Sequence, residues 1–105
     1  MEDKLNTIIN IFGKSEIRSV WDKEKEDYYF SVVDVVSALT GSNEPRKYWS
    51  VLKTRLKKDG SQLTTKCSQL KMTANDGKQR LMDVLDTEGI FRLIESIPSP
   101  NLVFL

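Results

Sequence analysis

The residues with the clearest capacity for chemistry are the lysines and arginines between positions 45 and 80. This segment holds ten Lys or Arg residues against two acids, Asp59 and Asp76, while the residues before and after it carry net negative charge. The net charge of the chain is only +1 because these parts cancel. Ammonium and guanidinium groups concentrated in one segment attract phosphate, so the pattern predicts a surface that binds double-stranded DNA.

Many of these cations fall on a predicted helix at 44–59. At about 100° per residue, its apolar residues gather on one face, namely Tyr48, Trp49, Leu52 and Leu56. The predicted DNA contacts follow another face: Arg46, Lys47, Ser50, Lys53, Thr54, Lys57 and Lys58. Arg55 and Val51 fall at the boundary. A solvated amphipathic helix usually mixes charges, but no acid occurs between Pro45 and Lys58, which favours a helix that enters the major groove. Arg46 is expected to read guanine, and the lysines to hold phosphates.

A basic hairpin is predicted at 66–80, with strands at 69–73 and 78–84. The Asn75-Asp76-Gly77 sequence indicates the turn, because Asp and Gly tolerate positive φ. Further phosphate contacts are expected on this hairpin from Lys66, Lys71, Lys78 and Arg80. Its core residues are expected to be Leu70, Met72, Leu81 and Val84.

The rest of the chain predicts the elements that hold this surface. Strand-like runs at 16–21 and 28–32 suggest another hairpin. Ser31 can cap a helix that ends at Gly41, with Asp34 as the second member of a weak capping box. Asn43 is expected to cap the 44–59 helix, 61–68 to form a loop, and Asp86 or Thr87 to begin a helix that runs to Ile97. Residues 3–13 fit a helix or a strand equally.

Together these elements predict one α+β domain over residues 1–105. The expected fold is a small winged helix-turn-helix-like domain with two β-hairpins and about three helices. With 39% hydrophobic residues, the chain suits a soluble globular module. No apolar run approaches the roughly 20 residues that span a bilayer, and the N-terminus lacks a signal-peptide pattern. A cytoplasmic location is therefore expected.

Composition excludes several classes of site. The chain has no histidine, so it cannot form Ser-His-Asp, Cys-His or histidine–zinc sites. A single cysteine, Cys67, excludes an internal disulfide and is interpreted as a partly buried structural residue. The acids at 22–27 alternate with lysines between two strands, as expected of a solvated hairpin tip. The chain is thus predicted not to be an enzyme and to need no metal or cofactor.

Several segments resemble one protein family. They are Tyr29 to Val36, Leu39-Thr40, Pro45 to Trp49, Asp83 to Asp86 and Arg92 to Pro100. Over about residues 12–100 the chain is similar to the Bro-N domain, the N-terminal module of baculovirus Bro proteins and phage antirepressors. The resemblance implies DNA binding in phage or prophage transcription regulation, in a module usually joined to variable C-terminal domains. It assigns no individual DNA contact.

One departure from the family pattern leaves alternatives open. Family members commonly continue into another helix after the Pro-Ser-Pro turn, whereas here 101–105 is a short apolar segment, either a truncated end or a surface covered by an oligomer. The main alternative function is a protein-interaction module that captures a repressor through this tail. RNA binding through Tyr28 and Tyr29 is a third alternative. A homodimer is a further alternative, because proteins that recognise DNA commonly bind it as two-fold symmetric dimers.

Overall fold

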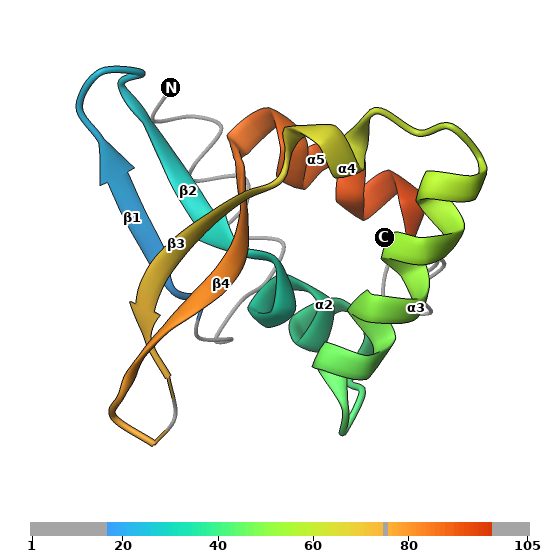
Figure 1. The fold of residues 1–105 in the computed structure, drawn as a ribbon, viewed down its shortest axis with the longest axis horizontal. Helices are drawn as coiled ribbons and strands as arrows, with labels where there is room; N and C mark the ends of the chain where they lie inside the picture. The colour runs from blue at the N-terminus through green and yellow to red at the C-terminus, as the bar shows by residue number, and fades with distance from the viewer. Residues whose placement is uncertain (1–16, 75, 98–105) are drawn as a thin grey trace.

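The computed structural model describes residues 17–74 and 76–97, which fold as one sheet with helices packed on it (Figure 1). The α+β class is confirmed, and each predicted helix and strand of this part is found within a few residues of its expected ends. In chain order the elements are β1 (Ser19–Asp22), β2 (Asp27–Ser31), α2 (Val32–Thr40), α3 (Pro45–Lys58), α4 (Leu63–Lys66), β3 (Ser68–Thr73), β4 (Gln79–Asp86) and α5 (Thr87–Ser96).

The two predicted hairpins join into one antiparallel sheet with the order β1-β2-β4-β3. The joining pair is β2–β4, with Phe30 opposite Leu85. The sheet curls enough for its two edges to meet, since Arg18 Nη1, just before β1, donates to the Thr73 carbonyl at the end of β3 at 2.9 Å. The order of α2, α3 and the β3–β4 hairpin agrees with a winged helix-turn-helix, but α4 intervenes and β4 also pairs with β2, so that assignment remains a prediction.

The ends of α2 follow the sequence signals, with one change. Ser31 Oγ accepts a hydrogen bond from the Asp34 amide at 3.3 Å, and Gly41 ends the helix with φ of 67°, a conformation that favours glycine. The reciprocal half of the capping box is absent here, because the Ser31 amide donates to the Arg18 carbonyl. The Asp34 carboxylate instead accepts two hydrogen bonds from the Arg18 guanidinium, at 2.6 and 2.7 Å.

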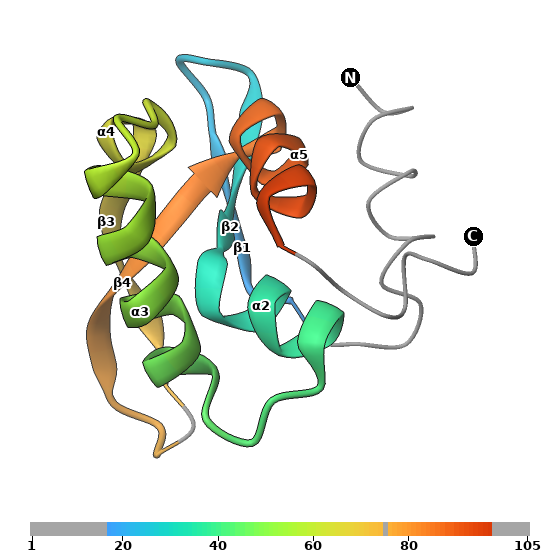
Figure 2. The same cartoon turned by 90° about the vertical axis from the view of Figure 1, so that its right-hand side faces the viewer.

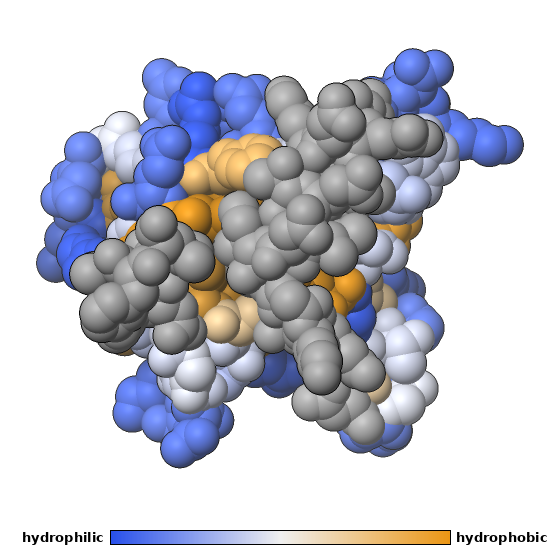
Figure 3. Space-filling model, turned by 180° about the vertical axis from the view of Figure 1, so that it is seen from behind, coloured by the Kyte–Doolittle hydropathy of each residue, from blue (hydrophilic) through white to orange (hydrophobic). Residues whose placement is uncertain are grey.

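Two hydrophobic clusters lie on opposite faces of the sheet. The larger is formed by α2, α3, α5 and the inner strands, and includes Val35, Leu52, Leu85 and Leu93. The smaller holds Tyr29, Met72, Ala74, Met82 and Val84, with Leu70 packed against it. Seen from behind, hydrophobic side chains gather near the centre of the described surface and hydrophilic ones surround them (Figure 3).

Leu81 was predicted to lie in the core, and this is wrong, since its side chain is 60% exposed. Successive side chains of a strand point to opposite faces. Met82 and Val84 enter the smaller cluster, so Leu81 points to the other face, where it is left uncovered near the end of the hairpin.

Two local predictions between α2 and β3 are also corrected. Residues 61–68 contain the one-turn helix α4 rather than only loop, because Leu63 packs into the larger cluster and is 3% exposed. The N-cap of α3 is Glu44 rather than Asn43, and it makes no side-chain capping hydrogen bond. Pro45 occupies the first helical position, as expected. The predictions for 3–13 and 101–105 lie outside the described residues.

Gly89 is a buried glycine in the first turn of α5, where its amide donates to Asp86 Oδ1 at 2.8 Å. A Cβ here would lie 2.9 Å from Leu85 Cδ2 and 3.1 Å from Asp86 Oδ1. We expect Gly89→Ala to lower the free energy of unfolding by about 1–2 kcal/mol, because displacing Leu85 outweighs the gain in helix propensity. Urea denaturation measures this, with the exposed Glu95→Ala as control; a stabilised Gly89→Ala would contradict the packing.

Candidate nucleic-acid interface

Helix α3 buries one face and presents the other to solvent. Trp49, Leu52 and Leu56 are buried, and Tyr48 is half-buried, as the helical projection predicted. The opposite arc is exposed and carries five cations, here named the basic ridge: Arg46, Lys47, Arg55, Lys57 and Lys58. None of the five makes a side-chain hydrogen bond or ion pair with residues 17–74 or 76–97. Ser50 and Thr54 are exposed between them, with Thr54 Oγ1 donating to the Ser50 carbonyl at 3.0 Å.

The charge distribution on α3 does not favour the helix itself. Its first turn contains Arg46 and Lys47 and no acid, although the helix dipole favours negative charge there. Lys57 and Lys58 in the last turn are favourably placed. Because no acid lies on the helix, the usual i,i+4 ion pairs cannot form within it. Packing of the apolar face therefore stabilises α3, and the basic ridge remains available to an external anion.

Lys53 differs from the other predicted α3 contacts, because it binds an acid within the chain. Its Nζ lies 2.9 Å from Asp83 Oδ2 on β4 and 5.7 Å from the centre of the Trp49 ring. The same carboxylate accepts hydrogen bonds from Trp49 Nε1 at 2.7 Å and Gln69 Nε2 at 3.2 Å. Asp83 was not among the predicted site residues. Only the fold shows that it joins α3 to the β3–β4 hairpin.

The electrostatics of Asp83 follow from this network. Partial burial acts to raise the pKa of the Asp83 carboxyl, but the hydrogen bonds from Trp49, Lys53 and Gln69 and the charge of Lys53 outweigh it. The pKa therefore lies below its usual range. Asp83 is ionised at neutral pH and holds the Lys53 ammonium beside the hairpin.

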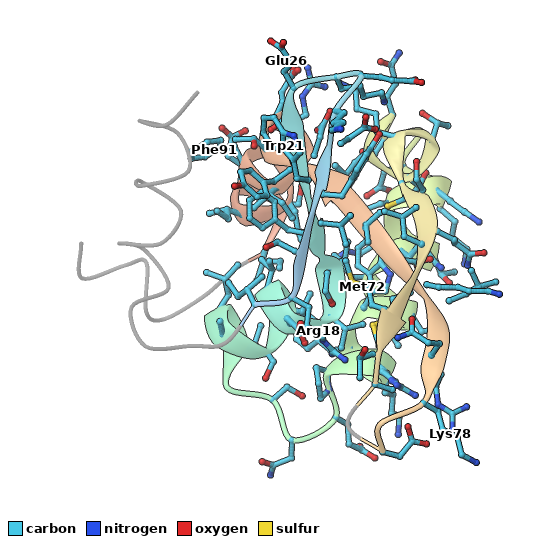
Figure 4. All side chains as sticks on the ribbon, turned by 90° about the vertical axis from the view of Figure 1, so that its left-hand side faces the viewer. Arg18, Trp21, Glu26, Met72, Lys78 and Phe91 are labelled. Carbon is cyan, nitrogen blue, oxygen red and sulfur yellow. The ribbon has the colours of Figure 1, made fainter. Side chains whose placement is uncertain are left out.

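On the hairpin, two of the three predicted contacts are unpaired. Lys71 and Lys78 are exposed without a side-chain partner among the described residues, and Figure 4 shows Lys78 near the hairpin tip. Arg80 Nη2 lies 2.5 Å from Asp76 Oδ2, and this hydrogen bond lowers the pKa of Asp76. Lys66 is not on the hairpin; it lies on α4 with its Nζ 3.7 Å from Glu88.

The fold places α3 and the β3–β4 hairpin on the same side of the molecule, toward the viewer in Figure 1 and at the left in Figure 2. A depression of about 290 Å³ lies between them. Its α3 wall includes Arg46, Ser50 and Lys53, and its hairpin wall includes Arg80, Leu81 and Asp83. The predicted contacts from two distant parts of the sequence thus border one concave surface.

Two exposed acids, Glu24 and Glu26, lie in the β1–β2 turn. Of these, Glu26 lies at the opposite end of the molecule from Lys78, as the labels in Figure 4 show. No group of three or more Cys, Asp or Glu residues within 17–74 and 76–97 is arranged to hold a metal ion. No helix of this same part is long and apolar enough to cross a membrane.

The other residues considered for chemistry take structural positions. Tyr29 is buried and its hydroxyl accepts from Lys25 Nζ at 2.6 Å, while Tyr28 packs edge-on against Trp21 with ring centres 4.9 Å apart. These tyrosines therefore do not form an open stacking platform. The pKa of the half-buried Cys67 thiol is raised to about 11, mainly because burial disfavours the thiolate. The thiol is therefore neutral at physiological pH.

The chain matches a known protein family. The family model of the BRO family N-terminal domain, Bro-N, matches residues 16–103, which include all of the described elements. No curated protein and no solved structure gives a match. Membership of this family is consistent with a phage or viral regulator of the antirepressor kind. Since the match covers most of its length, the chain belongs to the Bro-N family.

Proposed function

We propose that this chain is the duplex DNA-binding module of an antirepressor-type transcription regulator of a phage or prophage. It would act in the cytoplasm, without catalysis, metal or cofactor. The observation that carries the proposal is the basic ridge. Its five exposed cations have no acid among them on the helix, and none makes a side-chain hydrogen bond or ion pair in the described part of the chain. Family membership supports a regulatory role but specifies no ligand.

The dimensions of α3 suit the major groove. The groove is about 12 Å wide and admits one helix, and the 14 residues of α3 extend about 20 Å. Arg46 would read guanine through its planar fork, while Ser50 and Thr54 would offer hydroxyls to base edges. Lys47, Lys57 and Lys58 would bind phosphates, as would Lys71, Lys78 and Arg80 on the hairpin. Lys53 would position α3 against Asp83 rather than bind DNA.

The test is fluorescence anisotropy with random duplex DNA over a salt series. The six proposed phosphate contacts, three on the ridge and three on the hairpin, predict a slope of log K against log salt of about −5. Affinity would then fall by about a thousand-fold between 50 and 200 mM salt. Affinity that stays constant over this range would contradict DNA binding through the ridge.

A protein-interaction module that captures a repressor is the second candidate. It is favoured by exposed apolar residues on the edge strand β1, where Val20 is 39% and Trp21 45% exposed. A surface of this kind binds proteins with little dependence on salt. The salt series therefore separates the two functions. A homodimer is compatible with either, and light scattering of the free chain measures it.

A further inference from the structure

The most exposed large hydrophobic residue of the described chain is Val51, in the middle of α3. Its exposed fraction is 65%, against 39% for Val20 and 60% for Leu81. Valine has a lower helix propensity than alanine because branching at Cβ restricts its rotamers. Val51 therefore gains little burial and slightly disfavours its own helix. Neither packing nor helix stability explains why a valine occupies this position.

Charge surrounds Val51. Lys47 and Arg55 lie four residues away on either side, on the same surface of the helix. Val51, Lys47 and Arg55 border a depression of about 350 Å³ together with Ser42, Glu44, Tyr48 and Leu52, so two cations face one acid and the lining keeps a net positive charge. An apolar protein partner would remove water from the two cations without pairing them, which is costly. Duplex DNA would supply phosphates for them, so charge complementarity selects DNA as the occupant.

We infer that Val51 reads a thymine, by packing against its C5-methyl group in the major groove. This inference rests on the proposed function and extends it to sequence preference. The thymine methyl is the distinctive apolar group that base pairs present in the major groove, and small apolar side chains recognise it by contact. Val51 lies on the exposed arc one turn from Thr54, so a helix placed with Thr54 toward the bases also presents Val51 to them.

The experiment uses deoxyuridine, which lacks only the C5-methyl group. Preferred duplexes are first selected from a random library with the wild-type chain, and each thymine is then replaced in turn. We expect one or two replacements to weaken wild-type binding about four-fold, the effect of one buried methyl group. Val51→Ala should weaken binding to the thymine duplex by a similar factor and show no further loss with deoxyuridine. Val20→Ala makes the same change on β1, and its binding should weaken on deoxyuridine replacement as much as that of the wild type.

Each other result has a distinct meaning. Equal deoxyuridine sensitivity in wild type and Val51→Ala would overturn the thymine contact while leaving DNA binding in place. Absence of binding to any duplex by the folded wild-type chain would overturn both the contact and the proposed function. A change of oligomeric state in Val51→Ala, measured by light scattering, with unchanged DNA affinity would overturn the contact and assign Val51 to an interface between copies. Circular dichroism checks that each variant is folded.

Discussion

Replacing Lys47, Lys57 and Lys58 together by glutamine is expected to weaken binding to duplex DNA by about a hundred-fold at about 0.1 M salt. Each phosphate contact contributes close to one unit to the slope of log K against log salt concentration. Losing three contacts should therefore also reduce the magnitude of that slope by up to about 3. The three lysines are exposed and unpaired within the described residues, so the fold loses no contact. The effect on the free energy of unfolding should stay within about 0.5 kcal/mol.

The matched control removes three positive charges from other surfaces, in the variant Lys23→Gln, Lys66→Gln and Arg92→Gln. Lys23 lies in the β1–β2 turn, and Lys66 and Arg92 both pair with Glu88. If net charge alone governed affinity, the two triple variants would bind alike. Binding through the ridge predicts that the control loses no more than a few-fold, so equal losses would argue against a localised interface.

The second large effect concerns stability. Asp83→Ala is expected to lower the free energy of unfolding by about 2–3 kcal/mol, because Trp49 Nε1 and Lys53 Nζ lose their acceptor in a partly buried position. Asp76→Ala is the matched control on the same hairpin. Its ion pair with Arg80 is about half exposed on both sides and screened by water, so this change should cost much less stability than Asp83→Ala. Urea denaturation of both variants measures the difference, and similar losses would contradict the role of Asp83.

The lowered pKa of Asp83 also predicts a pH dependence. A carboxyl whose pKa is lower in the folded state stabilises the protein above its unfolded pKa, near 3.9, and this contribution disappears as pH falls through the folded value. Stability should therefore be constant near neutrality and fall below about pH 4. Asp83→Asn should lose less stability over the acid range than the wild type. If the free energy of unfolding of Asp83→Asn fell with pH as steeply as that of the wild type, groups other than Asp83 would cause the acid destabilisation.

Local signals in the sequence predicted most elements, and each has a short-range cause. Ser31 and Gly41 bound α2 because a hydroxyl cap and a left-handed residue act within one helical turn. The apolar face of α3 was predictable because Trp49, Leu52 and Leu56 follow helical spacing. The signal missed at α4 was a single buried residue, Leu63, in a polar segment too short to show periodicity.

The composition and order of the chain by themselves determined the α+β class, the acid-free exposed arc of α3 and its family. Residues within one helix or hairpin carry that information, because their neighbours in space are their neighbours in sequence. The tertiary structure alone decided which cations remain free. Asp83 lies 30 residues from Lys53 and 34 from Trp49, and the two meet it only because α3 packs beside β4. Pairing across such separations depends on how the sheet and helices assemble, and it gives Lys53, a predicted DNA contact, an acidic partner within the chain.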